Sequence, residues 1–213
     1  TEGVFKIQTV LTKFHEMQIL EISQRGAPHG VQAEPKAGSH FRELFRRMEG
    51  AARSLATELG RELTFEFVGG ELAVRPVWEI PLDSALLNLV RNSLDHGAKD
   101  SKTLKITVTV TEENSCTVVE FTDNGCGIDP GAVRRAALER RIRFDAELLR
   151  MSEDQVLQLL FSPAFSLSRG VSLLSGRGYG LNIVREAIES RLGGAVRLES
   201  SPGQGTRIIA RFS

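Results

Sequence analysis

The sequence predicts an α+β fold, a two-layer sandwich in which a mixed β-sheet carries helices on one face. Helical and strand patterns follow in the order α-β-(β)-α-β-β, then a long polar segment, then α-β-β. This order lacks the regular alternation of strand and helix that a parallel doubly wound sheet requires. The last four strand patterns can pair as two hairpins, and 213 residues with 41% hydrophobic content suffice for a packed core.

The first elements follow from periodicity. Residues 40–60 repeat apolar side chains at helical spacing and end at a glycine. The segment "ELTFEFV" (62–68) alternates as a strand, and "ELAVRP" is a short second strand candidate. Residues 79–97 predict the next helix, with Pro81 in its first turn, where proline is tolerated.

The second half is predicted in the same way. A turn "EENS" separates the next two strands, and "SPGQG" separates the last two. The predicted elements are strands 103–111, 116–122, 195–200 and 206–212, and helices 132–141, 152–160 and 180–192.

The residues before position 40 predict a separate N-terminal part. Residues 4–23 show apolar side chains at a/d spacing for about two heptads, too short a helix to be stable alone. Residues 26–39 contain three glycines and two prolines and indicate a linker. We therefore expect a single helix in residues 1–25, a linker at 26–39 and one domain at 40–213. The chain begins with Thr and ends directly after a strand pattern, so we expect it to be a piece of a larger protein.

Composition excludes several classes of function. Lys plus Arg and Asp plus Glu both number 27, so the balanced charge gives no general reason to bind nucleic acid or an acidic membrane. No apolar run approaches the roughly 18 residues of a membrane span, and no signal peptide is visible. Cys116 and Cys126 form no CxxC pattern, which indicates neither a disulfide framework nor a zinc site. A cytoplasmic location is the simplest expectation.

A stripe of hydrogen-bonding side chains runs along the predicted helix 79–97. Asn88, Asn92, Asp95 and His96 share one helical face, and apolar residues occupy the opposite face. A merely solvated polar face is the alternative interpretation. The stripe contains almost no Lys or Glu, the usual residues of such a face, and this favours a functional role.

A second motif, "FTDNGCGID", follows a predicted strand. Asp123 lies at the tip of that strand, where its carboxylate can accept a hydrogen bond from an amino group. Gly125 and Gly127 allow positive φ and the close approach of a flat ligand. An ordinary Asp-Asn-Gly turn is the alternative interpretation.

A third motif, "SGRGYGLNIV" (175–184), places Gly176, Gly178 and Gly180 directly before a predicted helix. Their backbone N–H groups can surround an anion at the positive end of the helix dipole. A flexible hinge before a helix is the alternative. The GxGxG spacing is not a Rossmann fingerprint, and the absence of Gly-Lys-Ser/Thr excludes a Walker A loop.

Together the motifs resemble a known superfamily. "NLVRNSLDHG", "DNGCGID", "LFSPAFS", "SGRGYGLNIV" and the terminal "GQGT" are similar, in order, to the boxes of the GHKL superfamily of gyrase, Hsp90, histidine kinases and MutL. Within it, residues 40–213 resemble the ATP-binding kinase domain of CheA-type chemotaxis histidine kinases. The resemblance implies a Bergerat-type ATP-binding fold, with a long ATP lid at residues 128–175.

The resemblance also implies roles for residues. Asp123 would receive the adenine amino group, Asn92 would hold Mg²⁺ with help from His96, and Arg177 would add positive charge at the phosphates. Arg135 and Arg140 would add charge from the lid, while Phe161 and Phe165 would anchor it. The implied catalytic residues are Asn88 and Asn92, and the implied nucleotide-binding set is Asn92, Asp95, His96, Asp123, Gly125, Gly127, Ser175, Gly176, Arg177, Gly178, Tyr179, Gly180, Leu181 and Thr206.

The implied reaction is transfer of the γ-phosphoryl group of ATP to a histidine on a separate phosphotransfer domain. A response regulator would act downstream, and a chemoreceptor or coupling protein would bind through domains absent from this chain. Only one helix precedes the linker, whereas the family dimerises through a two-helix hairpin, so the oligomeric state stays open.

Position 88 departs from the family pattern, which usually places a histidine or glutamate four residues before the metal-binding asparagine. The Asn88 carboxamide cannot take a proton. We therefore expect reduced but measurable phosphotransfer. The alternatives are a nucleotide-binding regulatory module with little turnover and an ATPase of the gyrase or Hsp90 type, which would need a glutamate to activate water.

Overall fold

The computed structural model describes residues 40–97, 103–166 and 180–213, without the side chains of a few residues such as His96. The predicted helix in residues 1–25 and the predicted linker at 26–39 lie outside these ranges. Residues 39–213 group into one compact unit.

This unit is built around one mixed sheet of five strands, which lie in the order β1-β2-β3-β5-β4. β1 runs parallel to β2, and every other neighbouring pair is antiparallel. The two predicted hairpins are confirmed as β2–β3 and β4–β5. The strands are β1 (Glu62–Val68), β2 (Thr103–Glu113), β3 (Cys116–Asp123), β4 (Ala195–Ser200) and β5 (Thr206–Phe212).

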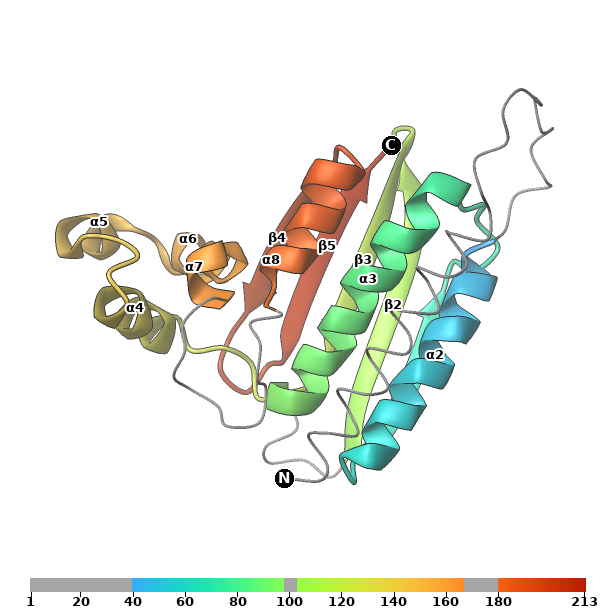
Figure 1. Cartoon of the computed structure of the whole chain (residues 1–213), viewed down its shortest axis with the longest axis horizontal. Helices are drawn as coiled ribbons and strands as arrows, with labels where there is room; N and C mark the ends of the chain where they lie inside the picture. The colour runs from blue at the N-terminus through green and yellow to red at the C-terminus, as the bar shows by residue number, and fades with distance from the viewer. Residues whose placement is uncertain (1–39, 98–102, 167–179) are drawn as a thin grey trace, which may run out of the picture. The chain divides into compact units, whose positions relative to one another are not determined.

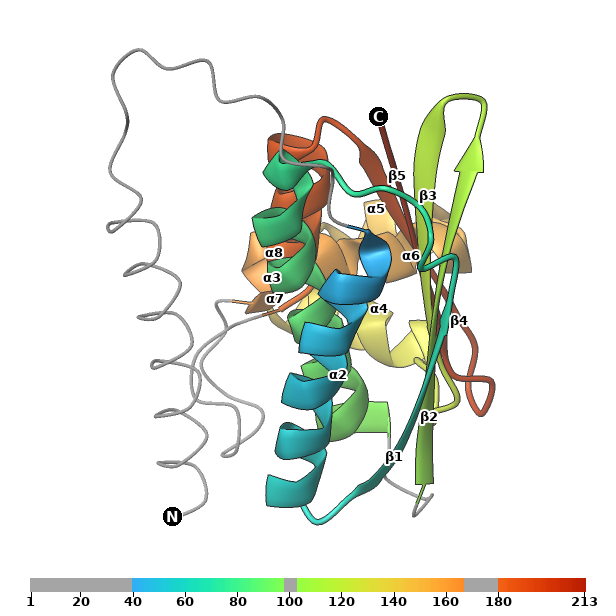
Figure 2. The ribbon, with the colours of Figure 1, turned by 90° about the vertical axis from the view of Figure 1, so that its right-hand side faces the viewer.

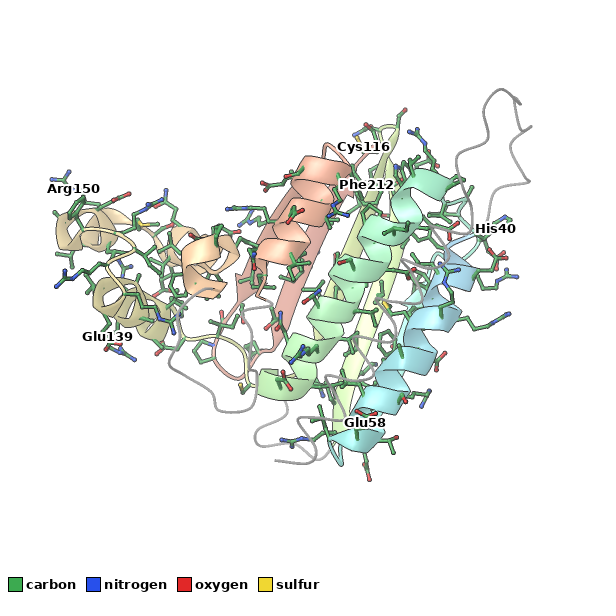
Figure 3. The ribbon with its side chains drawn as sticks, viewed as in Figure 1. His40, Glu58, Cys116, Glu139, Arg150 and Phe212 are labelled. Carbon is green, nitrogen blue, oxygen red and sulfur yellow. The ribbon has the colours of Figure 1, made fainter. Side chains whose placement is uncertain are left out.

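Helices α2 (Phe41–Glu58), α3 (Pro76–Asn92) and α8 (Asn182–Arg185) cover one face of the sheet, as Figures 1 and 2 show. The core lies between the two layers. Its aromatic part includes Phe45, whose ring stacks on that of Phe67 with centroids 4.5 Å apart. A second aromatic contact in the core joins Trp78 to Phe212, which is labelled in Figure 3, and these two rings pack edge to face. The predicted α+β sandwich is confirmed.

Several predicted boundaries are wrong. The segment "ELAVRP" forms no strand, because only Ala73 makes an isolated bridge, with His40. α3 begins at Pro76, so Pro81 lies inside the helix rather than in its first turn. The helix predicted at 79–97 does end at Gly97, and it changes from an α-helix to a π-helix at Ser93–Gly97. The helix predicted from residue 180 likewise changes from α8 into a π-helix, Glu186–Arg191.

The segment between β3 and α8 contains more helix than predicted. The two expected helices appear, and the short helices α5 and α7 were missed because six and four residues carry too little periodicity. Ala137, Leu148 and Leu159 form a small buried cluster of their own among these helices. The elements are α4 (Pro130–Glu139), α5 (Asp145–Arg150), α6 (Glu153–Gln158), a 3₁₀ turn (Leu159–Phe161) and α7 (Pro163–Ser166).

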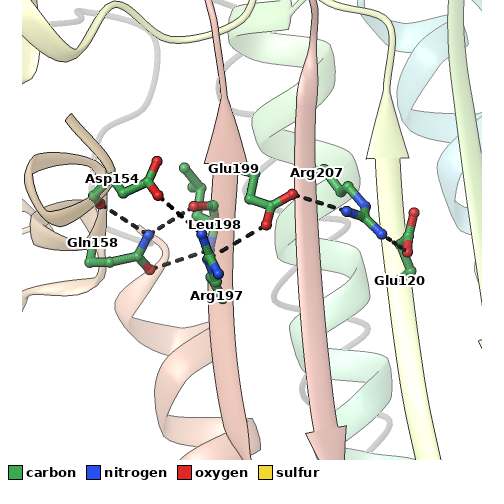
Figure 4. Close-up of polar contacts among 7 residues, drawn as sticks. All are labelled: Glu120, Asp154, Gln158, Arg197, Leu198, Glu199 and Arg207. Atoms are coloured by element: carbon green, nitrogen blue, oxygen red, sulfur yellow. Dashed lines mark hydrogen bonds and ion pairs between the residues drawn. The ribbon is translucent and has the colours of Figure 1, made fainter. Parts of the chain in front are cut away.

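The side chain of Gln158 attaches α6 to the edge strand β4, as Figure 4 shows. Its Nε2 donates to the carbonyl oxygen of Leu198 at 2.8 Å, and its Oε1 accepts the N–H of Leu198 at 3.2 Å. The Arg197 guanidinium also donates to the Asp154 carboxylate at 3.1 Å. One carboxamide thus satisfies both backbone groups of an edge-strand residue, as a neighbouring strand would.

A row of charged side chains continues from that point across the open face of the sheet (Figure 4). Arg207 on β5 donates to Glu120 on β3 at 2.6 Å and to Glu199 on β4 at 3.0 Å. Hydrogen bonds to these carboxylates, that to Glu120 above all, raise the pKa of Arg207. The pairs are largely solvent-exposed, so each adds little to stability, and they mark this face as solvated.

We predict that Gln158→Glu destabilises the domain. Glutamate lacks the amide donor and places a negative charge against the Leu198 carbonyl oxygen, so the free energy of unfolding should fall by about 1–3 kcal/mol. Urea denaturation measures this change. Gln155→Glu is the matched control, because the Gln155 Oε1 accepts the Ser152 N–H at 2.9 Å and a carboxylate keeps that bond. Equal losses for the two variants would contradict the role of Gln158.

Candidate functional site

At one end of the sheet the inward-facing side chains change from apolar to polar. Successive residues of a strand alternate between the two faces. Val119 and Phe121 are buried beneath the helices, and Asp123 is the next residue on that side of β3. Ile208 is buried on β5, and Thr206 precedes it on the same side as the register partner of Asp123. The core therefore ends in a polar rim.

The carboxylate of Asp123 is held from two sides. The hydroxyl of Ser93 donates to Oδ2 at 2.7 Å, and the backbone N–H of Gly125 donates to Oδ1 at 2.8 Å. Ser93 is 4% exposed, whereas Asp123 is only partly buried. The arrangement fixes an acceptor that ligands can still reach.

Two glycines let the chain approach itself beside Asp123. Gly205 has φ +74°, and a Cβ there would overlap the carbonyl oxygen of Asp123. Gly127 has φ +68°, and a Cβ there would overlap the carbonyl oxygen of Ser201. The β4–β5 turn is thus pressed against the loop that follows β3, and side chains at these positions would separate the two.

Ser200 and Asn124 fasten this loop to the strands around it. The Ser200 hydroxyl donates to the carbonyl oxygen of Gly205 at 2.6 Å and accepts the N–H of Ile128 at 2.9 Å. The Asn124 Oδ1 accepts the N–H of Lys105, on β2, at 2.7 Å. The loop after β3 is therefore hydrogen-bonded to β2 through Asn124 and to β4 through Ser200, which also bonds to the β4–β5 turn.

The polar stripe of α3 lies partly in this region. Asn92 is the last residue of α3 and directly precedes Ser93. Asn88 donates from Nδ2 to the carbonyl oxygen of Ser84 at 2.9 Å, along its own helix. The Asp95 carboxylate lies 3.5 Å from the Nε of Arg91, with which it forms an ion pair along the helix. The His96 side chain lies outside the described residues.

The structure describes only the last residues of the predicted phosphate loop. Residues 175–179, with Ser175, Gly176, Arg177, Gly178 and Tyr179, lie outside the described ranges. Gly180 and Leu181 lie at the start of α8, where the Gly180 carbonyl oxygen accepts the Ile183 N–H at 3.1 Å.

Arg135 and Arg140, the arginines expected to add charge at the phosphates, both have protein partners in the segment between β3 and α8. Arg135 pairs with Asp129, the N-cap of α4, at 3.4 Å. Arg140 donates to the carbonyl oxygen of Phe165 at 3.2 Å and stacks over its ring. Phe161 is fully buried in the main core, and Phe165 packs against it. These rings thus anchor the segment as expected, whereas the two arginines brace it.

The described residues offer one oxygen ligand for Mg²⁺ and no complete protein cage. Over the described ranges, no three His, Cys, Asp or Glu residues gather into a metal-binding group. Mg²⁺ is commonly held by one or two protein oxygens together with substrate phosphates, so no protein cage is needed. The amide oxygen of Asn92, next to Ser93 at the polar rim, is a suitable ligand of this kind.

Sequence reasoning missed three residues of the rim, namely Ser93, Ser200 and Gly205. Ser200 was detectable, because it follows Leu198 on the inward side of a correctly predicted strand. Gly205 belongs to the quoted "GQGT" motif. Ser93 belongs to the quoted "NLVRNSLDHG" motif, but the sequence does not reveal where a π-helix begins and so gave no reason to single it out.

Residues 79–213 match the protein family described as "Histidine kinase-, DNA gyrase B-, and HSP90-like ATPase". The match spans the rim and both glycine motifs. The chain belongs to this family. The predicted membership of the GHKL superfamily is confirmed, and the family description names its members as ATPases.

Within this family, the chain is similar to proteins named for chemotaxis and gliding motility. The chain is 36% identical over 180 residues to "Chemotaxis protein CheA" of Treponema pallidum, covering 80% of this chain and 22% of that protein. It is 32% identical over 172 residues to the protein of the same name from Listeria innocua, covering 76% and 28%. A "Gliding motility regulatory protein" of Myxococcus xanthus is 32% identical over 171 residues, covering 76% and 22%. The chain thus spans about a quarter of the length of these relatives.

Solved structures agree on the fold. The nucleotide-free catalytic domain of the histidine kinase ThkA has a TM-score of 0.53 at 20% identity and covers 81% of this chain and 91% of its own. The mycobacterial sensor histidine kinase MprB has a TM-score of 0.50 at 19% identity and covers 81% and 93%. Among the described helices, none has the length and apolar character needed to cross a membrane.

We predict that Gly205→Ala destabilises the family domain more than Gly203→Ala. Both glycines have positive φ, at +74° and +76°, so alanine costs roughly 1–2 kcal/mol of backbone strain at each. A Cβ at Gly203 meets nothing within 4 Å, whereas one at Gly205 overlaps the Asp123 carbonyl oxygen. The overlap should remove about 1–3 kcal/mol more from the free energy of unfolding, measured in urea. Indistinguishable variants would show that the close approach is unimportant.

Proposed function

We propose that this domain binds Mg²⁺–ATP and transfers the γ-phosphoryl group to a histidine on a separate phosphotransfer domain. The observation that carries the proposal is the Asp123 carboxylate, fixed by Ser93 and Gly125 yet accessible at the polar rim. Such an acceptor suits the exocyclic amino group of adenine. Gly127 and Gly205 let the loop after β3 and the β4–β5 turn approach each other closely beside this carboxylate, which keeps it in place.

The chemistry asked of the chain is mainly positioning. Phosphoryl transfer depends on alignment and charge neutralisation, with little covalent work for the protein. Bound Mg²⁺ would neutralise phosphate charge, and Asn92 is the residue that we propose holds it, with help from His96, four residues later in the sequence. The accepting imidazole has an ordinary pKa near 6.5 and is largely neutral at pH 7, so it already offers a lone pair.

A nucleotide-binding regulatory module is the second candidate, and Asn88 is the observation that favours it. The Asn88 amide donates along its own helix, and a carboxamide cannot serve as a general base. Under this alternative the domain binds ATP or ADP and changes its interactions without transferring phosphate.

The similarity to the CheA proteins supports the proposed partners. They are a histidine-bearing phosphotransfer domain as acceptor, a response regulator downstream, and a chemoreceptor or coupling protein that binds through further domains. We place this pathway in the cytoplasm, in keeping with Cys116 and Cys126, which are both free thiols. The experiment that tests the function is incubation with γ-labelled ATP and an added phosphotransfer domain of a CheA-type relative. Label on the acceptor supports the kinase, free labelled phosphate an ATPase, and binding without either the regulatory module.

Asp123→Asn should weaken ATP binding. The amide replaces one acceptor oxygen with a donor and removes the charge, so affinity should fall roughly 10- to 100-fold. Isothermal titration calorimetry with and without Mg²⁺ measures the loss. Glu120→Gln is the matched control on the same strand, because Glu120 pairs with Arg207 on the open face. Unchanged affinity in Asp123→Asn would refute the proposed base site.

Asn88→His should speed phosphotransfer to the added acceptor domain. An imidazole at this position restores a proton acceptor, and general base catalysis contributes at most about 10²–10⁴ in rate. Quenched-flow transfer of labelled phosphate measures the rate. Asn88→Gln, which keeps a carboxamide, should stay slow. A slower or unchanged Asn88→His enzyme would contradict the assignment of position 88.

A further inference from the structure

Ser93 is a buried polar residue in direct contact with the proposed base site, and neither the predicted site nor the family match assigns it a role. It is 4% exposed, and its hydroxyl donates to the Asp123 Oδ2 at 2.7 Å across 30 residues of sequence. The other oxygen of the same carboxylate receives the Gly125 N–H at 2.8 Å. The carboxylate is thus clamped by one donor from the helix layer and one from the loop after β3.

The helix is shaped to deliver this hydroxyl. The α-helical pattern of α3 ends at Asn92, and Ser93 is the first residue of the π-turn Ser93–Gly97. A π-turn widens the helix by one residue per turn, and such turns are rare and concentrated at functional sites. The change of helix type therefore coincides with the residue that reaches Asp123.

The polarity of the clamp decides what else the carboxylate can bind. An ionised carboxylate only accepts hydrogen bonds, and each oxygen has about two lone pairs. Ser93 and Gly125 each occupy one, which leaves the others for a ligand that donates. A side-chain carboxylate otherwise turns readily about its last torsion, because rotation about an sp³–sp² bond is broad.

We propose that Ser93 is a positioning residue that sets nucleobase specificity: its hydroxyl locks the Asp123 carboxylate in the orientation that accepts the 6-amino group of adenine. A base with a carbonyl or a hydrogen at that position gains nothing from the locked acceptor. This inference rests on the proposed function, since it assumes that ATP is bound at Asp123. It adds a second residue, on a different element, to the recognition of the base.

The test compares two nucleotides that differ only in the amino group. ATP and purine riboside triphosphate, which lacks the 6-amino group, are titrated calorimetrically into wild type and Ser93→Ala. We expect the preference for ATP over the amine-free nucleotide to fall about tenfold in Ser93→Ala. Affinity for the amine-free nucleotide itself should change by less than about twofold.

Two controls separate positioning from general stability. Ser84→Ala changes a serine on the same helix whose carbonyl oxygen, not its hydroxyl, receives the Asn88 hydrogen bond, so its nucleotide preference should equal that of wild type. In an Asp123→Asn background, adding Ser93→Ala should leave the preference unchanged, because the group that Ser93 positions is already altered.

The outcomes are distinguishable. Equal weakening of both nucleotides, or an unchanged preference, in Ser93→Ala overturns the role of Ser93 and leaves the proposed function intact. A loss of preference in the Asp123→Asn background as large as in wild type also overturns it, because the effect would not pass through Asp123. Wild type that binds neither triphosphate overturns the proposed function itself.

Discussion

The close approach of the β4–β5 turn to the end of β3 is the constraint on which the site depends. Asp123 terminates a central strand, and its carbonyl oxygen lies so near Gly205 that only glycine fits there. This contact, together with the Gly127 contact to Ser201, leaves the Asp123 side chain at the boundary between core and solvent. A polar acceptor in that position is costly to bury unless it is hydrogen-bonded, and Ser93 and Gly125 supply those bonds.

The remainder of the domain holds this boundary in place. The sheet fixes Asp123 opposite Thr206, α3 brings Ser93 over the strand end, and Ser200 ties the loop to the turn. At the β4 edge of the sheet, Gln158 attaches α6 to β4. The segment between β3 and α8 is therefore held at its start, by the bond from Ile128 to Ser200, and again in its middle. The recognition groups therefore come from rigid elements, the arrangement in which small side-chain displacements matter most.

Much of this could be predicted from the sequence, because alternation and helical spacing record burial directly. Three strands have the predicted bounds, and Asp123, Gly125, Gly127 and Thr206 converge as expected. What could not be predicted depends on non-local packing. The stacking of Arg140 on Phe165 is such a contact, between segments 25 residues apart. The π-helix that begins at Ser93 could not be predicted either, because hydrophobic periodicity does not distinguish one π-turn from the α-helix before it.

Ser93 and Asn88 affect different steps of the proposed reaction. Ser93 acts on the ground-state recognition of the base, because its only described partner in the site is the Asp123 carboxylate. Asn88 lies more than one helical turn earlier and spends its amide donor on the Ser84 carbonyl oxygen, so it neither positions Asp123 nor removes a proton. A neutral imidazole acceptor needs little deprotonation, and phosphoryl transfer draws chiefly on alignment and charge. Loss of a base at position 88 should therefore lower the rate of transfer while leaving nucleotide affinity almost untouched. Both a slow kinase and a binding module keep that affinity, so phosphate on the acceptor is what distinguishes them.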